Sequence, residues 1–389
     1  MSLGIYIQVP FCQTKCTYCN FHTGPAARSL YAPYANAVVR EISEHGALYR
    51  SAGFAETDLD TANIADTIYV GGGTPSLLDP ADLARIVEAV RAHFAHNLSE
   101  VTLEADPQTV TSLKATAWRA AGINRISMGA QSLNDVELAA AGRMHRRQDI
   151  FNAVDCLRGA GFQDISLDLI AGLPHQTAAT WQHSLNELLR LRPEHVSIYL
   201  LEIDEGSRLG REVLAGGNRY GSAAVPDDDA MAAFYDSACE QLAAAGYDHY
   251  EISNWALRPN FRSRHNSKYW RREPYLGFGA GAHSFDGRLR WANAHDPAQY
   301  VAAIEKGTLP VEQREEITSA QALEEEMFLG LRQIEGVDLE SIEKRYQARL
   351  GPRVEPLLAQ GLLERDGARL RLAPGCLTVS NEVFVALLD

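Results

Sequence analysis

The sequence predicts an α/β fold, in which a partial (β/α)6 barrel precedes a C-terminal winged-helix-like α+β domain. Two observations support this prediction. Short β-branched runs alternate with longer helical stretches from residue 4 to about residue 255, and a different rhythm of helices and short strands begins after Thr318. The chain has 389 residues, of which 46% are hydrophobic and 22% are charged, so it can bury the cores of two or three domains.

The barrel, residues 1–255, is predicted from six strands that alternate with helices. The strands are expected at Gly4–Pro10, Thr67–Gly71, Glu100–Ala105, Arg125–Gly129, Ser166–Ile170 and His195–Leu201. The helices are expected at Tyr31–Ser51, Pro80–Ala95, Val110–Ala121, Ile150–Ala160 and Thr177–Arg190. Repeated strand–helix units form parallel sheets with right-handed crossovers, so six units indicate an open or partial barrel. A flat doubly wound sheet is the alternative, because periodicity does not separate the two.

The C-terminal domain, residues 316–389, follows an aromatic and basic connecting segment at 256–315. Its helices are expected at Ala320–Gln333, Leu339–Arg349 and Val354–Gln360, and its strands at Leu362–Arg365 and Arg369–Leu372. Asp366-Gly367 between the two strands is a strong hairpin turn. This order is that of a winged helix, which often binds DNA. Residues 315–389 carry 8 Lys/Arg against 14 Asp/Glu, however, which favours a packing or lid domain.

Three of the six cysteines, Cys12, Cys16 and Cys19, lie within eight residues directly after the first predicted strand. In a reducing cytosol such a group indicates metal or redox chemistry. A structural zinc site would need a fourth protein ligand, for which His22 is the only nearby candidate. The C-x3-C-x2-C spacing favours a cubane [4Fe–4S] cluster, in which three thiolates bind three irons and the fourth iron stays open to a small molecule.

This loop, with Tyr6 before it and Tyr18 within it, resembles the radical S-adenosylmethionine superfamily, whose fold is a partial barrel. The resemblance implies that the amino and carboxylate groups of S-adenosylmethionine chelate the open iron, and that an electron from the cluster yields a 5′-deoxyadenosyl radical. It also implies that groups at the carboxyl ends of the strands hold the cofactor. The candidates are Gly72, Gly73 and Thr74 of the GGGTP run, and Glu104, Gln131, Arg143 and Asp168. Taken alone, the GGGTP run is equally consistent with a tight turn.

Six positive residues and no acid lie between Arg258 and Arg272, although the whole chain has a net charge of −14. A solvated basic loop is one interpretation. The other is a site for a flat, dianionic ligand, in which arginines bind carboxylates, aromatic rings cover a macrocycle and an imidazole binds its metal. On the second interpretation the candidate heme-binding residues are His265, Asn266, Tyr269 and Trp270.

The run H-N-x-x-Y-W over residues 265–270 resembles the HemW family of heme chaperones, which are relatives of the anaerobic coproporphyrinogen III oxidases. The oxidases carry a fourth cysteine where this chain has Phe21, and a long extension before the cluster where this chain has eleven residues. The resemblance therefore implies a heme chaperone that binds heme, a [4Fe–4S] cluster and S-adenosylmethionine. The alternatives are an oxygen-independent coproporphyrinogen III oxidase, which acts by radical oxidative decarboxylation, and a zinc-stabilised barrel with a binding tail.

The expected compartment is the cytoplasm. No apolar run approaches the roughly 20 residues that span a bilayer, and the N-terminus lacks the pattern of an export signal. The net charge of −14 predicts no nucleic-acid partner, because phosphates would be repelled. The partners that the resemblance implies are heme and heme-accepting respiratory proteins, and it leaves peripheral membrane association and a homodimer open.

Overall fold

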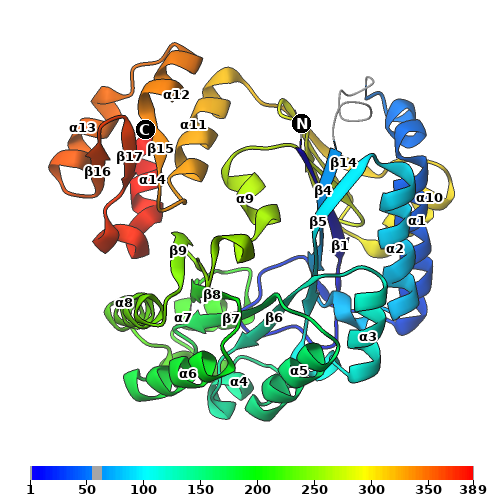
Figure 1. Ribbon diagram of the computed structural model, residues 1–389, viewed down its shortest axis with the longest axis horizontal. Helices are drawn as coiled ribbons and strands as arrows, with labels where there is room; N and C mark the ends of the chain where they lie inside the picture. Colours follow the sequence, from blue (N-terminus) through cyan, green and yellow to red (C-terminus); the bar gives the residue numbers. More distant parts are fainter. Residues whose placement is uncertain (1, 55–63, 389) are drawn as a thin grey trace.

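The computed structural model describes residues 2–54 and 64–388, and its centre is a curved, mostly parallel sheet with helices on the outer face (Figure 1). The strand order is β14-β13-β12-β11-β1-β4-β5-β6-β7-β8-β10-β9. The barrel wall consists of β1 (Ser2–Val9), β4 (Ile64–Gly72), β5 (His96–Ala105), β6 (Arg125–Gln131), β7 (Ile165–Ala171) and β8 (His195–Leu200). These strands pair in parallel in this order, and all six predicted strands are confirmed.

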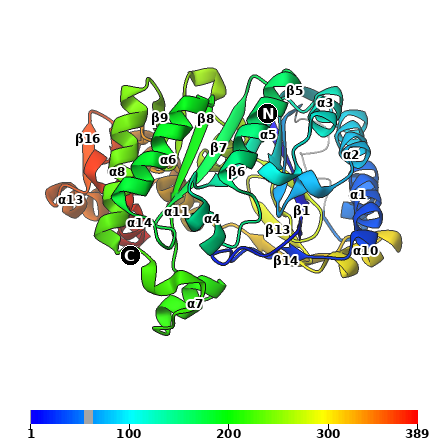
Figure 2. The same ribbon diagram turned by 90° about the horizontal axis from the view of Figure 1, so that it is seen from below.

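The helices between the strands lie on the outside of the curved sheet (Figure 2). They are α1 (Tyr31–Ser51), α2 (Pro80–His93), α3 (Ser112–Ala120), α4 (Asp135–Ala140), α5 (Arg147–Gly159), α6 (Ala178–Leu191) and α8 (Asp228–Ala244). Because helices cover one face of β4 and the barrel interior covers the other, five consecutive residues of this strand are buried. A short helix, α7 (Arg208–Leu214), projects away from the barrel near the predicted cysteine loop.

The sheet continues beyond the six barrel strands at both ends. At one end β11 (Tyr275–Phe278) pairs in parallel with β1, and β12 (His283–Phe285), β13 (Leu289–Asn293) and β14 (Val311–Glu316) follow in antiparallel order. At the other end lie β10 (Asn254–Ala256) and β9 (Asp248–Glu251). Sequence analysis did not predict these short strands, because strands of three to six residues carry little periodicity. The division of the chain at residues 255 and 315 stays a prediction.

A buried carboxyl group on α1 fastens the first barrel unit to the strands added after β11. Glu41 is 0% exposed and accepts hydrogen bonds from Gly279 N (2.9 Å), Asn293 Nδ2 (2.8 Å) and Tyr300 Oη (2.6 Å). The last donor belongs to α10 (Pro297–Glu305). Burial raises the pKa of Glu41 to about 7 although these hydrogen bonds favour the carboxylate.

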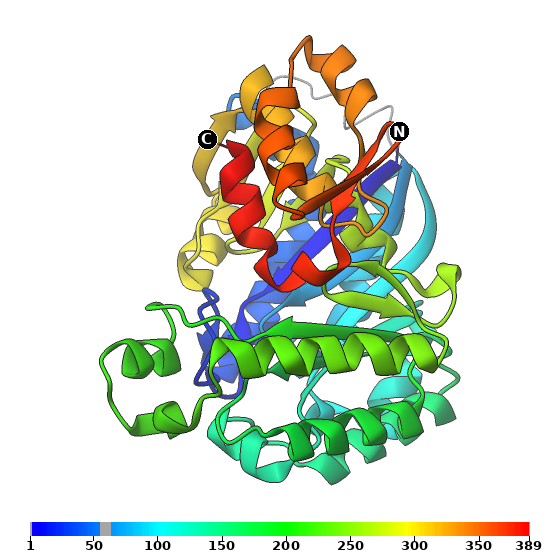
Figure 3. The same ribbon diagram turned by 90° about the vertical axis from the view of Figure 1, so that its left-hand side faces the viewer.

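The C-terminal domain lies over the open side of the barrel (Figure 3). Its elements are α11 (Ser319–Gly330), β15 (Val337–Asp338), α12 (Leu339–Tyr346), α13 (Gly351–Ala359), β16 (Leu363–Asp366), β17 (Arg369–Leu372) and α14 (Ser380–Leu388). The three predicted helices and the hairpin are confirmed, and Gly367 adopts the expected positive φ of 59° in the turn. The segment 332–334, which follows α11, joins the C-terminal domain to the strand region at 250–252. Arg332 O accepts a hydrogen bond from Ile252 N (2.9 Å), and Ile334 N donates to Tyr250 O (3.1 Å). No helix in residues 2–54 and 64–388 is long and apolar enough to cross a membrane.

Replacing Glu41 by Gln should flatten the pH dependence of folding stability. Because the pKa of Glu41 is higher in the folded state than in the unfolded state, the folded state binds more protons between about pH 4.5 and 7, and the free energy of unfolding falls as the pH rises through this interval. The difference between the ordinary pKa of 4.5 and the folded-state pKa of about 7 corresponds to at most about 3 kcal/mol in the free energy of unfolding.

Urea unfolding at pH 5 and pH 8 measures this contribution. The natural chain should lose more stability between these pH values than the Glu41→Gln variant does. Glu44→Gln is the matched control, because Glu44 lies on the same helix with its side chain 45% exposed. The same pH dependence in the natural chain and in Glu41→Gln would contradict the prediction.

Candidate functional site

A cavity of about 710 Å³ opens at the carboxyl ends of the barrel strands. Its lining comes from the cysteine loop, the ends of strands β4 to β8, the helix that contains Asn266, and the C-terminal domain. Twelve residues that the sequence predicted as site residues line it: Cys12, Cys16, Tyr18, Cys19, Gly72, Gly73, Thr74, Glu104, Gln131, Arg143, Asp168 and Asn266. Tyr6, His265, Tyr269 and Trp270 do not line it.

The loop with the three cysteines is held by backbone hydrogen bonds to neighbouring segments. Thr17 N donates to Ala141 O (3.0 Å) beyond α4, and Leu209 N of α7 donates to Thr17 O (2.8 Å). All three thiols are free and partly buried. In the described part of the chain no three His, Cys, Asp or Glu side chains are arranged to hold a single metal ion. The backbone hydrogen bonds hold the loop in place, and its three cysteines all line one cavity.

The GGGT turn after β4 lies against the start of the cysteine loop. Gly73 N donates to Val9 O (2.8 Å) and Thr74 N donates to Phe11 O (2.7 Å). Gly72 has a φ of 111°, a backbone conformation that residues other than glycine rarely adopt. A Cβ atom at Gly73 would lie 2.6 Å from Phe11 O, so only glycine allows this approach. The turn thus joins the carboxyl ends of β1 and β4 and leaves backbone groups at the cavity wall.

Arg143 connects the cysteine loop to the strands at the opposite wall. Its guanidinium donates to Cys16 Sγ (3.4 Å), Asp106 Oδ2 (2.7 Å) and Gly129 O (2.9 Å). Burial alone would raise the pKa of Asp106, but the hydrogen bond from His145 and the charge of Arg143 outweigh it and hold this pKa below its usual value. Asp106 and His145 are residues that sequence analysis missed. The position of Asp106 directly after β5 was the available signal.

Two buried carboxyl groups line the deeper part of the cavity. Glu104 accepts from Tyr69 Oη (2.9 Å) and Gly72 N (2.9 Å), and burial raises its pKa to about 7. Asp168 accepts from Ser127 Oγ (3.2 Å) and Ser166 Oγ (3.3 Å), and burial raises its pKa as well. Such groups can accept hydrogen bonds from the hydroxyl and amino groups of a nucleoside.

The H-N-x-x-Y-W run forms α9 (Arg264–Trp270), whose two faces contact different surroundings. His265 is 1% exposed, and its ring nitrogens lie 2.9 Å from Thr67 Oγ1 and 2.9 Å from Tyr269 Oη. Burial lowers the pKa of His265 to about 3, so its imidazole is neutral, and both nitrogens are engaged in this arrangement. Asn266 lines the cavity, and the Trp270 ring lies under the guanidinium of Arg332.

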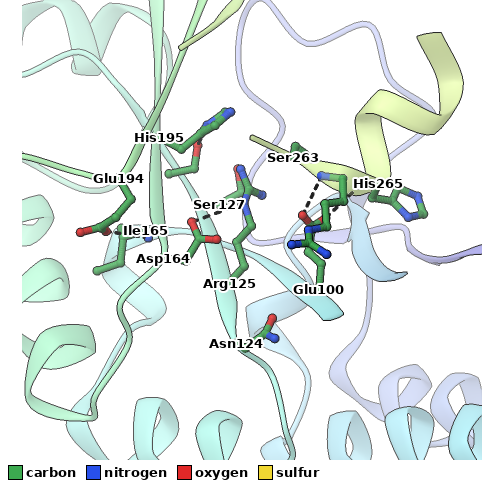
Figure 4. A network of polar contacts seen from close by, with 12 residues as sticks. Glu100, Asn124, Arg125, Ser127, Asp164, Ile165, Glu194, His195, Ser263 and His265 are labelled. Carbon is green, nitrogen blue, oxygen red and sulfur yellow. Dashed lines mark hydrogen bonds and ion pairs between the residues drawn. The ribbon is translucent and has the colours of Figure 1, made fainter. Parts of the chain in front are cut away.

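A buried carboxylate fixes the beginning of α9 (Figure 4). Glu100 on β5 accepts from the backbone N–H groups of Arg264 (2.8 Å) and His265 (3.1 Å). Arg125 lies between Glu100 and Asp164 in the same network and is 3.6 Å from the Asp164 carboxylate. Tyr6 on β1 packs near the His265 ring and donates to Gln8 Oε1 (2.7 Å). Neighbouring strands of the sheet therefore hold both the start of α9 and its buried histidine.

Acids from distant segments neutralise most of the basic stretch at 258–272. The ion pairs are Arg262–Asp248 (2.6 Å), Lys268–Asp66 (2.8 Å), Arg271–Glu273 (2.7 Å) and Arg272–Glu325 (2.8 Å). Arg258 and Arg264 have no ion pair within 4 Å in the described residues. Three of the four acids come from outside 256–315, so the local sequence did not reveal them.

Comparison with known proteins gives matches over nearly the whole chain. Residues 6–188 match the family model of the radical SAM superfamily, and residues 317–374 match that of the HemN C-terminal domain. The protein named heme chaperone HemW of Bacillus subtilis is 33% identical over 389 residues, which is 98% of each chain. The protein of that name from Mycobacterium tuberculosis H37Rv is 36% identical over 374 residues, 95% of this chain and 90% of its own.

Among solved structures, coproporphyrinogen III oxidase (HemN) from Escherichia coli has a TM-score of 0.81 and 22% identity, and the match covers 99% of this chain and 89% of that chain. This likeness shows the fold. Together with the superfamily match, it defines a radical SAM protein with a HemN-like C-terminal domain. At 33% and 36% identity to relatives of matching length, the chain belongs to the HemW family.

Replacing Gly73 by Ala should destabilise the folded protein by about 1–3 kcal/mol, because the new Cβ would overlap with Phe11 O and displace the turn from the cysteine loop. Gly24→Ala is the matched control. Gly24 pairs with Phe11 in the same loop, but no atom lies within 4 Å of the position that its Cβ would take. Urea unfolding of both variants checks the prediction, and equal stability of Gly73→Ala and Gly24→Ala would contradict it.

Proposed function

We propose that this protein is a heme chaperone that binds heme and a [4Fe–4S] cluster with S-adenosylmethionine, and that transfers heme to acceptor proteins. The observation that supports it most directly is the identity of 33% over 98% of both chains with a relative named heme chaperone HemW. Heme-accepting respiratory proteins are the proposed recipients, and the cytoplasm is the proposed location. Peripheral contact with a membrane and a homodimer remain compatible with this function, and nucleic acid is not a proposed partner.

The proposed cluster ligands are Cys12, Cys16 and Cys19. Three thiols in one loop suit three corners of a cubane cluster, and the adjacent Arg143 guanidinium would compensate part of the negative charge of their thiolates. When bound, the cluster and S-adenosylmethionine supply one-electron chemistry. The chain would hold the cofactor with Tyr18, Gly72, Gly73, Thr74, Glu104, Gln131, Arg143 and Asp168, all of which line the cavity. Tyr6 supports this wall from outside the cavity.

The proposed heme-binding residues are His265, Asn266, Tyr269 and Trp270. Burial keeps the imidazole of His265 neutral, which is the form that binds iron. Because its Nε2 atom lies 2.9 Å from Tyr269 Oη, coordination through this atom requires α9 or Tyr269 to move. The proposed heme-bound state therefore differs from the described one at the contact between His265 and Tyr269.

Replacing Cys16 by Ser should abolish the cluster, because a hydroxyl is a far weaker iron ligand than a thiolate. After anaerobic reconstitution the natural chain should contain roughly four irons and absorb broadly in the visible range. Cys156→Ser is the control, because Cys156 lies on α5 against Ser112 Oγ (3.4 Å) and does not line the cavity. This variant should retain the natural iron content. Bound zinc without iron in the natural chain would contradict the proposal.

Replacing His265 by Ala should change the absorption spectrum of bound heme and weaken heme binding about tenfold or more, since a metal ligand is lost. Titration of the reconstituted protein with heme measures both effects. His183→Ala is the control, because His183 is exposed on α6. If His265→Ala binds heme with the natural spectrum and affinity, the proposed iron ligand is wrong.

The alternative function, oxidation of coproporphyrinogen III, is assayed in the same preparation. Phe21 stands where the oxidases carry their fourth cysteine, which argues against it. Anaerobic incubation with coproporphyrinogen III, S-adenosylmethionine and a reductant should give no protoporphyrinogen. Formation of protoporphyrinogen would establish the oxidase instead.

A further inference from the structure

Polar side chains from two parts of the chain line the end of the cavity that faces the C-terminal domain. Ser253 and Asn266 contribute from the barrel side, and Thr378 and Ser380 contribute from the C-terminal domain. Arg332 lies at the junction, in the segment that pairs with the edge of β9. In the described residues none of these five side chains takes part in a hydrogen bond through its polar atoms. Their donors and acceptors are therefore open to a ligand.

Arg332 differs from the other arginines that line the cavity. Arg143 is paired with Asp106 at 2.7 Å, and Arg125 lies 3.6 Å from Asp164. Arg332 has no carboxylate within 4 Å in the described part of the chain, and its Nε atom is buried without a partner. The neighbouring acid, Glu251, accepts instead from the Asn254 side chain. Burial raises the pKa of Glu251, and the nearby charge of Arg332 offsets part of this rise, but no carboxylate of the described residues uses the guanidinium donors. Unused guanidinium donors beside a cavity can bind an anion through charge-assisted hydrogen bonds.

The orientation of Arg332 suits a planar anion. Its guanidinium carbon lies 4.6 Å from the centre of the Trp270 ring, so the flat face of the guanidinium is occupied by a cation–π contact. The N–H groups at its edges remain available. Parallel N–H groups of this kind bind a carboxylate through two hydrogen bonds, which lysine does not reproduce.

We propose that Arg332, with Asn266 and Thr378 lining the same cavity, binds a propionate of heme there. The inference rests on the proposed function, which supplies such a group in the propionates of heme; the carboxylate of S-adenosylmethionine is expected on the open iron at the cysteine loop. The C-terminal domain is thereby part of the ligand site, because Thr378 belongs to it.

Three titrations of the reconstituted full chain under anaerobic conditions test the proposal: with heme, with the dimethyl ester of heme, and with S-adenosylmethionine. The test variant is Arg332→Gln, which keeps a planar polar group on a shorter side chain and removes its charge. Arg371→Gln is the matched control, because Arg371 lies on the C-terminal domain surface paired with Glu364. Because Arg332→Gln removes a charge-assisted hydrogen-bonded pair with the carboxylate, it should bind heme about tenfold or more weakly than the natural chain does.

Weaker binding of heme by Arg332→Gln, with the dimethyl ester unaffected, would support the proposal and identify the propionate. Weaker binding of S-adenosylmethionine with heme unaffected would overturn it, because Arg332 would then serve the cofactor and not a propionate. If neither ligand binds more weakly, or if heme and its ester weaken equally, the proposal is overturned. If the natural chain itself binds no heme, the proposed function fails, and the propionate site fails with it.

Two further variants separate ligand binding from folding. Arg332→Lys keeps the charge but loses the paired N–H groups, so its affinity should lie between those of the natural chain and Arg332→Gln. Thr378→Val keeps the shape of the side chain and removes one hydroxyl, and it should weaken the same ligand by a smaller factor. If Arg332→Lys and Thr378→Val both bind heme as tightly as the natural chain, the proposal is overturned, whether or not Arg332→Gln folds.

Discussion

The site depends on the parallel register of the barrel strands. In β1 and β4, Gln8 pairs with Gly71 and Val9 pairs with Gly72, so both strands end at the same level. The cysteine loop leaves the sheet at the end of β1, and the glycine turn leaves it at the end of β4. Because β5, β6 and β7 continue the same parallel order, Glu104, Gln131 and Asp168 reach the same cavity from distant parts of the sequence. A change of register in any pair would separate these groups.

The charges around this cavity are compensated in pairs by segments that are far apart in the sequence. Arg143 joins Asp106 to the cysteine loop, and Glu100 joins β5 to the start of α9. No cation of the described residues forms an ion pair with Glu104 or Asp168. Both accept hydrogen bonds from neutral donors, and burial raises their pKa values. Arg332 shows a different case: the Trp270 ring lies beneath it, and in the described residues no carboxylate lies within ion-pair distance, although the charge of Glu251 is near enough to interact with it. The cavity therefore combines buried carboxyl groups that accept hydrogen bonds from neutral donors with one arginine whose donors no carboxylate uses in the described residues.

The sequence predicts the barrel and the cavity lining well because both depend on local patterns. β-branched runs, helix starts and cysteine spacing are all visible within a few residues, and parallel strands then bring their ends together. What the sequence did not predict depends on contacts across the fold. The acids that neutralise Arg262, Lys268 and Arg272 come from other segments, and the two faces of α9 separate His265 from Asn266 only when the helix is packed. The part that Thr378 and Ser380 play in the cavity follows from the docking of the C-terminal domain, for which the sequence carries no local signal.

The strand β14 has a further consequence for the protein in solution. It forms one edge of a twelve-stranded sheet, and open edges of long sheets are templates for pairing with other chains. Its last five residues, Glu312 to Glu316, are all exposed, and four of them are charged. A second strand laid against this edge would place like charges side by side and would desolvate them. The acidic edge thus protects an open sheet against aggregation.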